Sequence, residues 1–194
     1  MKFFIIALLF TPAIAICQDT LHRAFSLKDN KVYYERIIDL PSQKKDQIYK
    51  SVKSWGVNAF NSQKDVLQAD DRETGIVAFK YFFTVVFEAP KMLGITNAAD
   101  WKYWQILKVF LKDDKVKVIV EDVLLNEPWH GDMKIETIRS STEELLKKSM
   151  AGKGYRERYY AQVYKNFQKA NARILATIDD LEHALKSGKS DFDF

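Results

Sequence analysis

The stretch that decides the fold is residues 75–88, which read GIVAFKYFFTVVFE. Successive side chains of a β-strand point to opposite faces, so an apolar residue at every second position predicts a strand with one buried face. That face carries Val77, Phe79, Tyr81, Phe83, Val85 and Phe87. The opposite side is mixed, and we expect it to be half exposed. It carries Ala78, Lys80, Phe82 and Thr84.

Three further segments have the β-branched and aromatic composition of strands. They are Lys31–Leu40, Trp101–Lys112 and Lys115–Asn126. The Asp113-Asp114 pair between the last two suits a tight turn and predicts an antiparallel hairpin. We expect turns or loops between the elements, at residues 70–75, 89–99 and 127–132.

Helical periodicity follows the first strand and returns near the C-terminus. Ser42 stands at a candidate N-cap, and apolar residues then recur at three- and four-residue steps. They are Ile48, Val52, Trp55 and Ala59. A short helix is expected from residue 143 to Met150, and a long helix from Tyr155 to Lys186. The apolar stripe of the long helix is Tyr160, Val163, Phe167, Ala170, Ile174, Ile178, Leu181 and Leu185.

This order of elements predicts an α+β fold, with helices packed on one face of an antiparallel sheet. Several strings resemble a bacterial family of exported proteins, a domain of unknown function with a TATA-box-binding-protein (TBP)-like fold. They are YERII at 34–38, Trp55 with FNS at 60–62, KDVLQ at 64–68, and Asp71 with GIV at 75–77. The resemblance covers Val32 to Asn126, although a typical member would carry another glycine within residues 78–80. It implies a curved sheet in β-α-β-β-β order and no established activity, and a shared fold does not bring DNA binding with it.

The first seventeen residues predict a secretory signal peptide. Lys2 supplies a positive start, Phe3–Phe10 is an apolar run, and small residues follow where a signal peptidase cuts. We expect the mature chain to begin at Gln18 in the periplasm or outside the cell. The alternative is a lipoprotein anchored through Cys17, which Ile16 disfavours because lipoprotein signals place a small residue before the cysteine.

The chain then divides into a polar lead-in, the TBP-like domain, two C-terminal helices and a tail. The expected bounds are 18–30, 31–140, 141–187 and 188–194. Removal of the leader leaves 29 basic and 26 acidic residues, an excess too small for a nucleic-acid binder. Three histidines and no remaining cysteine argue against a transition-metal site, and no cofactor motif is present.

Two other candidate sites carry weaker predictions. His130 and Asp132 could serve a hydrolase-like enzyme, but no serine or cysteine motif supplies a nucleophile, so no catalytic residue is assigned. A basic face of the long helix could meet a membrane surface. It consists of Arg158, Lys165, Lys169 and Arg173.

The leading hypothesis is a non-enzymatic protein of the cell envelope that binds a partner or ligand through the uncovered face of the sheet or through the aromatic loop from Met92 to Trp104. Trp101, Tyr103 and Trp104 follow a long loop and are the predicted binding residues, although such aromatic residues more often belong to a core. The expected partner is an envelope protein or a small apolar or glycan ligand. The oligomeric state stays open.

Overall fold

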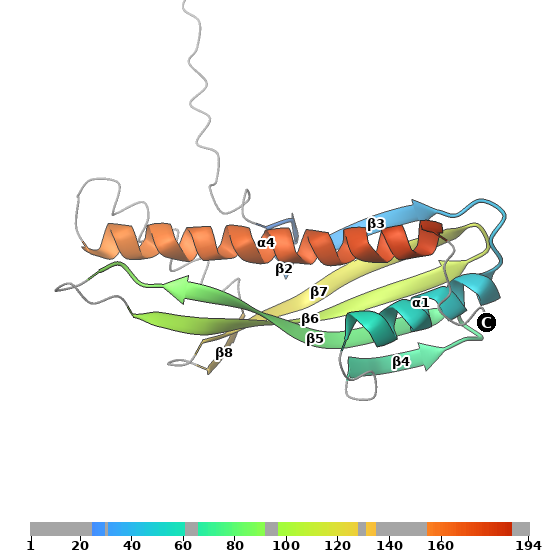
Figure 1. Ribbon diagram of the computed structural model, residues 1–194, viewed down its shortest axis with the longest axis horizontal. Coiled ribbons are helices and arrows are strands. Elements are labelled where there is room, and N and C mark those ends of the chain that lie inside the picture. Colours follow the sequence, from blue (N-terminus) through green and yellow to red (C-terminus); the bar gives the residue numbers. More distant parts are fainter. Residues whose placement is uncertain are drawn as a thin grey trace, which may run out of the picture.

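A computed structural model describes residues 25–29, 31–60, 66–91, 97–127, 131–134 and 155–187. Its main feature is an antiparallel sheet covered on one side by two helices (Figure 1). The sheet contains β3 (Tyr34–Asp39), β4 (Leu67–Asp71), β5 (Ile76–Glu88), β6 (Ala98–Lys112), β7 (Lys115–Glu127) and β8 (Gly131–Lys134). The helices are α1 (Lys45–Ala59) and α4 (Tyr155–Ser187), and a two-stranded ribbon joins β1 (Leu27–Lys28) to β2 (Lys31–Val32). The predicted α+β architecture is confirmed.

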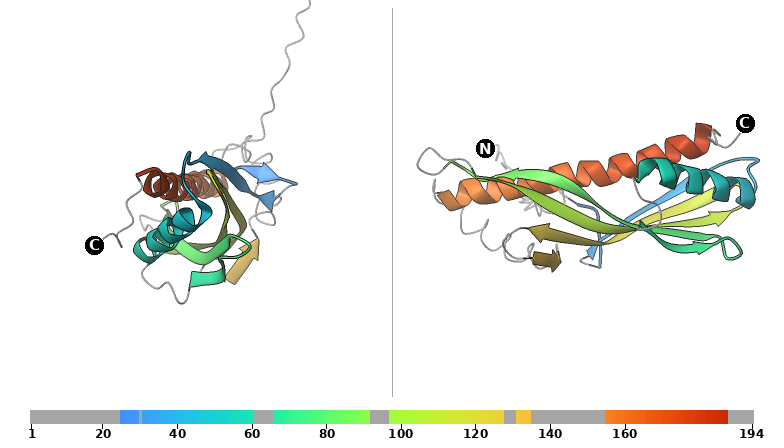
Figure 2. Two further views of the ribbon diagram at one scale, coloured as in Figure 1. Left: turned by 90° about the vertical axis from the view of Figure 1, so that its right-hand side faces the viewer. Right: turned by 60° about the horizontal axis from the view of Figure 1, so that its bottom comes forward.

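The strand order is β3-β7-β6-β5-β4, with β8 paired to β7. Strands β4 to β7 therefore form a meander, and β3 lies at the far edge beside β7. Helix α1 connects β3 at one edge to β4 at the other, so it must cross a face of the sheet. The end-on view in Figure 2 shows the strands curving around both helices.

Helix α4 covers the sheet along its length. Its 33 residues extend about 50 Å at 1.5 Å per residue, and the 15 residues of β6 extend about 50 Å at 3.4 Å per residue. The predicted stripe is buried from Val163 to Leu185, while Tyr160 at its start is half-buried. It packs on the face of β5 that the alternation predicts to be buried, where Val85 alone is half-buried.

Helix α1 packs close to the sheet at Gly56, where the absence of a side chain leaves room for the ring of Phe79. A Cβ atom at Gly56 would lie 2.6 Å from Cε1 of Phe79, a distance that real Cβ atoms do not adopt. The stripe of α1 is buried at Ile48, Val52 and Trp55. Ala59, expected on the same stripe, is exposed, and the last buried residue of the helix is Gly56.

The predicted N-cap of α1 is wrong. Lys44, not Ser42, precedes the first helical residue, and Ser42 has φ +69° in the turn after β3. Its backbone N–H donates to Oδ1 of Asp114 at 2.8 Å. The first backbone N–H group of the helix, that of Lys45, instead donates to Oδ1 of Asp113 in the β6–β7 hairpin at 2.7 Å.

All three predicted turns or loops overlap strands. Strand β6 already begins at Ala98, inside the loop expected at 89–99. Residues 67–71 form β4, an edge strand paired antiparallel with β5. From α1, the Tyr49 hydroxyl and the Lys53 ammonium each donate to the Asp70 carboxylate at 2.6 Å. The turn is confined to residues 72–75, where Gly75 has φ +74°. Likewise β7 runs to Glu127 and β8 begins at Gly131.

The leader, the short helix at 143–150 and the tail lie outside the described residues. Among the residues that are described, no helix is long and apolar enough to cross a membrane.

Candidate functional site

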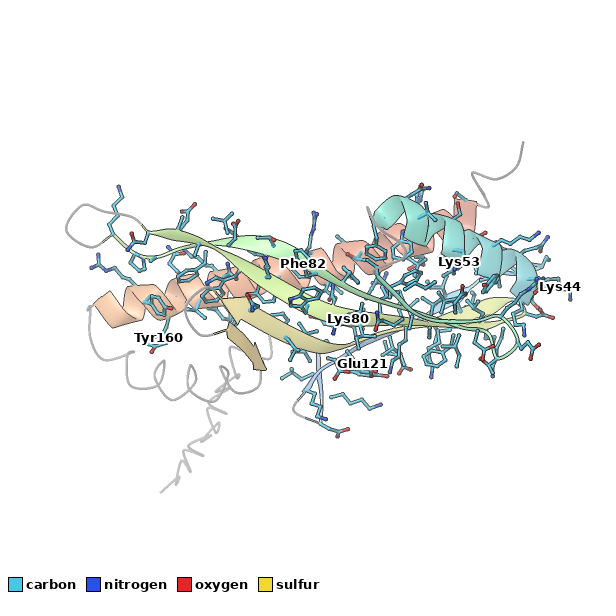
Figure 3. The ribbon with its side chains drawn as sticks, turned by 90° about the horizontal axis from the view of Figure 1, so that it is seen from below. Lys44, Lys53, Lys80, Phe82, Glu121 and Tyr160 are labelled. Atoms are coloured by element: carbon cyan, nitrogen blue, oxygen red, sulfur yellow. The ribbon has the colours of Figure 1, made fainter. Side chains whose placement is uncertain are left out.

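The candidate site is the face of the sheet that points away from α1 and α4, here called the open face. Alternation along each strand places every second residue on it. Its central row comes from β6 and is Lys102, Trp104, Ile106, Lys108, Phe110 and Lys112. Cations and apolar groups thus mix along one strand. Figure 3 shows this face from below, with Lys80 and Phe82 of β5 and Glu121 of β7 labelled.

An aromatic pair occupies the middle of the open face. Phe82 and Trp104 are direct cross-strand partners, and their ring centroids lie 4.7 Å apart. Phe82 is 44% exposed and Trp104 is half-buried. The pair therefore offers aromatic surface to a ligand instead of filling the core.

Two lysines flank the aromatic pair. The Lys80 ammonium lies 5.9 Å from the ring centroid of Trp104, and the Lys102 ammonium lies 5.4 Å from that of Phe82. Neither lysine forms an ion pair with a described residue. Both keep their charge free for an anionic group. Lys108, farther along β6, is paired with Glu121.

A β-bulge in β7 lies beside the aromatic pair. Trp104 faces Leu124 and Ile106 faces Glu121, so β7 holds one extra residue opposite Gln105. Asp122 has φ +52° there. The bulge keeps Val123 on the helix side and increases the local twist of the sheet.

A hollow of about 360 Å³ lies at the end of the open face nearest the β6–β7 hairpin. Its lining includes Ile37, Ile76, Phe110, Lys112, Lys115 and Lys117. A second cavity, of about 340 Å³, lies on the other side of the sheet between α1 and α4. It is lined by Trp55, Phe60, Tyr81 and Arg173, among others.

The described lining of the cavity between the helices lacks Trp104 and the flanking lysines of the open face, and part of its polar lining is engaged within the protein. The Tyr81 hydroxyl, which lines this cavity beside Thr177, is buried, and burial raises the pKa of this group. The indole N–H of Trp55 already donates to Oδ2 of Asp180 at 2.8 Å. We therefore regard the open face as the stronger candidate.

The structure separates the three predicted binding residues. Trp101 and Tyr103 point to the helix side and are buried, whereas Trp104 lies on the open face. Trp101 stacks on Phe87 at 4.3 Å between centroids, and the Tyr103 hydroxyl donates to Asn166 of α4. The three residues cannot line one surface, because alternation places Trp104 opposite its neighbours.

Sequence reasoning grouped the aromatic strand 79–87 with Trp101, Tyr103 and Trp104 as a possible ligand groove, but it did not pair Phe82 with Trp104 or assign a role to Lys80. That pairing depends on the register between β5 and β6, which is not visible in either segment alone. The alternation of side chains in both strands was the available signal.

For the other predicted sites, the described residues show no contact that would support a catalytic or metal-binding role. His130 lies outside the described residues, and Asp132 lies in β8 opposite Asn126. The described residues hold no group of three histidine, cysteine or acidic side chains that could bind a metal. Arg158, Lys165, Lys169 and Arg173 are exposed on α4, as the basic-face hypothesis requires.

Comparisons with known proteins agree with the fold. The family described as "Domain of unknown function (DUF4468) with TBP-like fold" matches residues 34–124 and confirms the resemblance. The crystal structure of a DUF4468 family protein from Bacteroides ovatus is 14% identical, with a TM-score of 0.53 over 82% of this chain and 90% of that one. A TBP-like protein from Parabacteroides distasonis is 13% identical, with a TM-score of 0.45 over 82% and 97%. No curated protein matches the chain.

Proposed function

We propose that this chain is an exported, non-enzymatic module that binds an acidic polysaccharide of the cell envelope. The family that matches residues 34–124 has no assigned function, so the proposal rests on the open face. The observation that carries the proposal is the Phe82–Trp104 pair on the open face, flanked by two lysines that form no ion pair with a described residue.

Export is supported by the sequence of the leader. Lys2, the apolar run Phe3–Phe10 and the small residues after it have the order of a signal peptide. A polysaccharide ligand would then be met outside the cytoplasm, where such polymers are present.

The chemistry of the pair suits a charged sugar chain. Aromatic faces bury a large apolar area at low conformational cost, and the C–H faces of sugar rings can stack on them. Lys80 and Lys102 lie beside the rings and can meet carboxylate or sulfate groups of the same chain. Cations at an exposed site act over roughly 10 Å at 0.1 M salt, so the interaction should weaken as salt rises.

The test is calorimetric titration of the protein with polygalacturonate and, separately, with neutral dextran. Wild-type protein should bind polygalacturonate and lose affinity with salt, and should bind dextran far more weakly. Phe82→Ala and Trp104→Ala should each weaken binding by roughly fivefold to tenfold, in keeping with about 1 kcal/mol for an aromatic contact. Val86→Ala is the matched control, because Val86 is 49% exposed on the same strand and face but outside the pair.

Three outcomes would contradict the proposal. They are equal affinity for dextran and polygalacturonate, unchanged affinity in both aromatic variants, and tighter binding of a single-stranded oligonucleotide than of either polysaccharide. The last would mean that the aromatic and basic groups serve nucleic acid.

A further inference from the structure

The hollow at the hairpin end of the open face is a second site, which the proposed function does not use. Trp104 and Phe110 are six residues apart on β6, which is roughly 20 Å at 3.4 Å per residue. The hollow holds about 360 Å³, within the size range of small-molecule sites. A ligand there would not contact the aromatic pair.

The floor of the hollow is apolar and accessible. Ile37 of β3 is 62% exposed, and Ile76 and Phe110 are half-buried. Ile37 and Ile76 come from strands on opposite sides of the β6–β7 hairpin, so the floor is a continuous patch across the sheet. A patch of this kind favours an apolar ligand group.

Three lysines border this floor: Lys112, Lys115 and Lys117. None forms an ion pair with a described residue. The Lys117 ammonium lies 5.2 Å from the ring centroid of Phe110, so one cation is held directly beside the apolar floor.

No acidic residue is among the described residues that line the hollow, and several nearby acids have other hydrogen-bond partners. Asp113 and Asp114 of the hairpin bind the backbone N–H groups of Lys45 and Ser42, at the start of α1. On β3, Glu35 accepts from the Tyr33 hydroxyl at 2.6 Å, and Asp39 is the register partner of Lys115. The described lining of the hollow itself therefore carries three cations and no carboxylate.

We propose that the hollow binds a single anionic amphiphile, such as a fatty-acid carboxylate. The acyl chain would lie on Ile37, Ile76 and Phe110, and the carboxylate would lie among the three lysines. This inference is independent of the polysaccharide proposal, because it uses other residues.

The experiment titrates the protein with dodecanoate below its aggregation concentration, and with dodecyl maltoside as a neutral-headgroup control. Wild-type protein should bind dodecanoate more tightly. The double variant Lys112→Gln/Lys117→Gln should lose roughly fivefold in affinity for dodecanoate and little for the maltoside. Ile37→Thr should weaken both ligands, and Lys102→Gln, at the other end of the same face, is the matched control and should change neither.

The folding of each variant is checked by comparing its unfolding transition with that of wild type. Substitutions at exposed positions should leave the midpoint of this transition unchanged. The proposal is overturned if wild-type protein fails to bind dodecanoate or if the lysine double variant binds it normally. It is also overturned if the protein binds phosphatidylglycerol vesicles but no monomeric amphiphile, because the hollow would then be part of a membrane-docking surface. Trp104→Ala should leave dodecanoate affinity unchanged, which separates this test from that of the polysaccharide site.

Discussion

At the scale of single residues, Gly56 determines how closely α1 approaches the sheet. Alanine is favoured over glycine inside a helix by about 1 kcal/mol. At this position the added methyl group would overlap the ring of Phe79, which is fully buried and cannot move into solvent. Overpacking of a core costs about 1–3 kcal/mol, so the clash should exceed the gain in helix propensity.

Gly56→Ala should therefore destabilise the protein by about 1–2 kcal/mol, as measured by denaturant unfolding. The control is Val57→Ala on the exposed side of the same helix, which should change the unfolding free energy by less than about 0.5 kcal/mol. A Gly56→Ala protein as stable as wild type would show that α1 and Phe79 are not in close contact.

Asp122 gives a second prediction, because its positive φ is a conformation that favours glycine. Asp122→Gly should be neutral or stabilising by up to about 1 kcal/mol, whereas Asp122→Val should cost about 1–2 kcal/mol or more. Thermal unfolding of the two variants measures this difference. Equal melting temperatures would argue against the bulge.

At the scale of elements, a cluster of charges joins β3 to the last turns of α4. The Arg36 guanidinium lies 2.5 Å from Asp179 and 3.0 Å from Glu182. Lys186 and then Arg36 hold the pKa of Glu182 below its ordinary value through hydrogen bonds. A carboxyl group whose pKa is lowered in the folded state stabilises the protein above its unfolded pKa, about 4.3, and this stabilisation is lost as pH falls.

Arg36→Gln should consequently destabilise the protein more at pH 7 than at pH 3, where the carboxyl groups are protonated. Urea unfolding at the two pH values measures the difference, and Lys31→Gln, at an exposed position of β2, serves as the control. A cost that does not depend on pH would mean that Arg36 contributes by packing alone.

Elements with a strong internal period could be predicted from the sequence, while those defined by distant contacts could not. The alternation in β5 and the stripe of α4 record one-sided burial directly. Strand β4 was not visible, since its acidic residues are typical of a turn, whereas its pairing with β5 and the contacts of Asp70 with Tyr49 and Lys53 are distant in sequence. The start of α1 was misplaced for the same reason: its cap, Asp113, is 68 residues away in sequence.

The residues of the binding site were likewise predictable only where the signal lies within one segment. Trp104 was predicted from its position in an aromatic segment, but its partner Phe82 depends on the register between β5 and β6. Trp101 and Tyr103 were grouped with Trp104 by proximity in sequence, although alternation separates them by face.

At the scale of the whole molecule, the sheet keeps its core and its candidate binding surface on opposite faces. The helices and the large buried side chains lie on one side, and the aromatic pair and the hollow lie on the other. Ligand binding on the open face should therefore leave the packing of the helices unchanged.

Export of the whole chain yields a separate prediction. Mass spectrometry of the protein from bacterial cells should give a mature chain that begins at Gln18, as expected for cleavage after Cys17. A lipid on Cys17 would instead identify an anchored lipoprotein, and a retained Met1 would contradict export by this signal.

The most direct test of the open face as the binding surface is nuclear magnetic resonance of the labelled protein during titration with polygalacturonate. The account predicts that shift changes centre on Lys80, Phe82, Lys102 and Trp104 and spare the buried stripe of α4. Changes centred on α4 or on the cavity beside Trp55, with the open face unmoved, would contradict it.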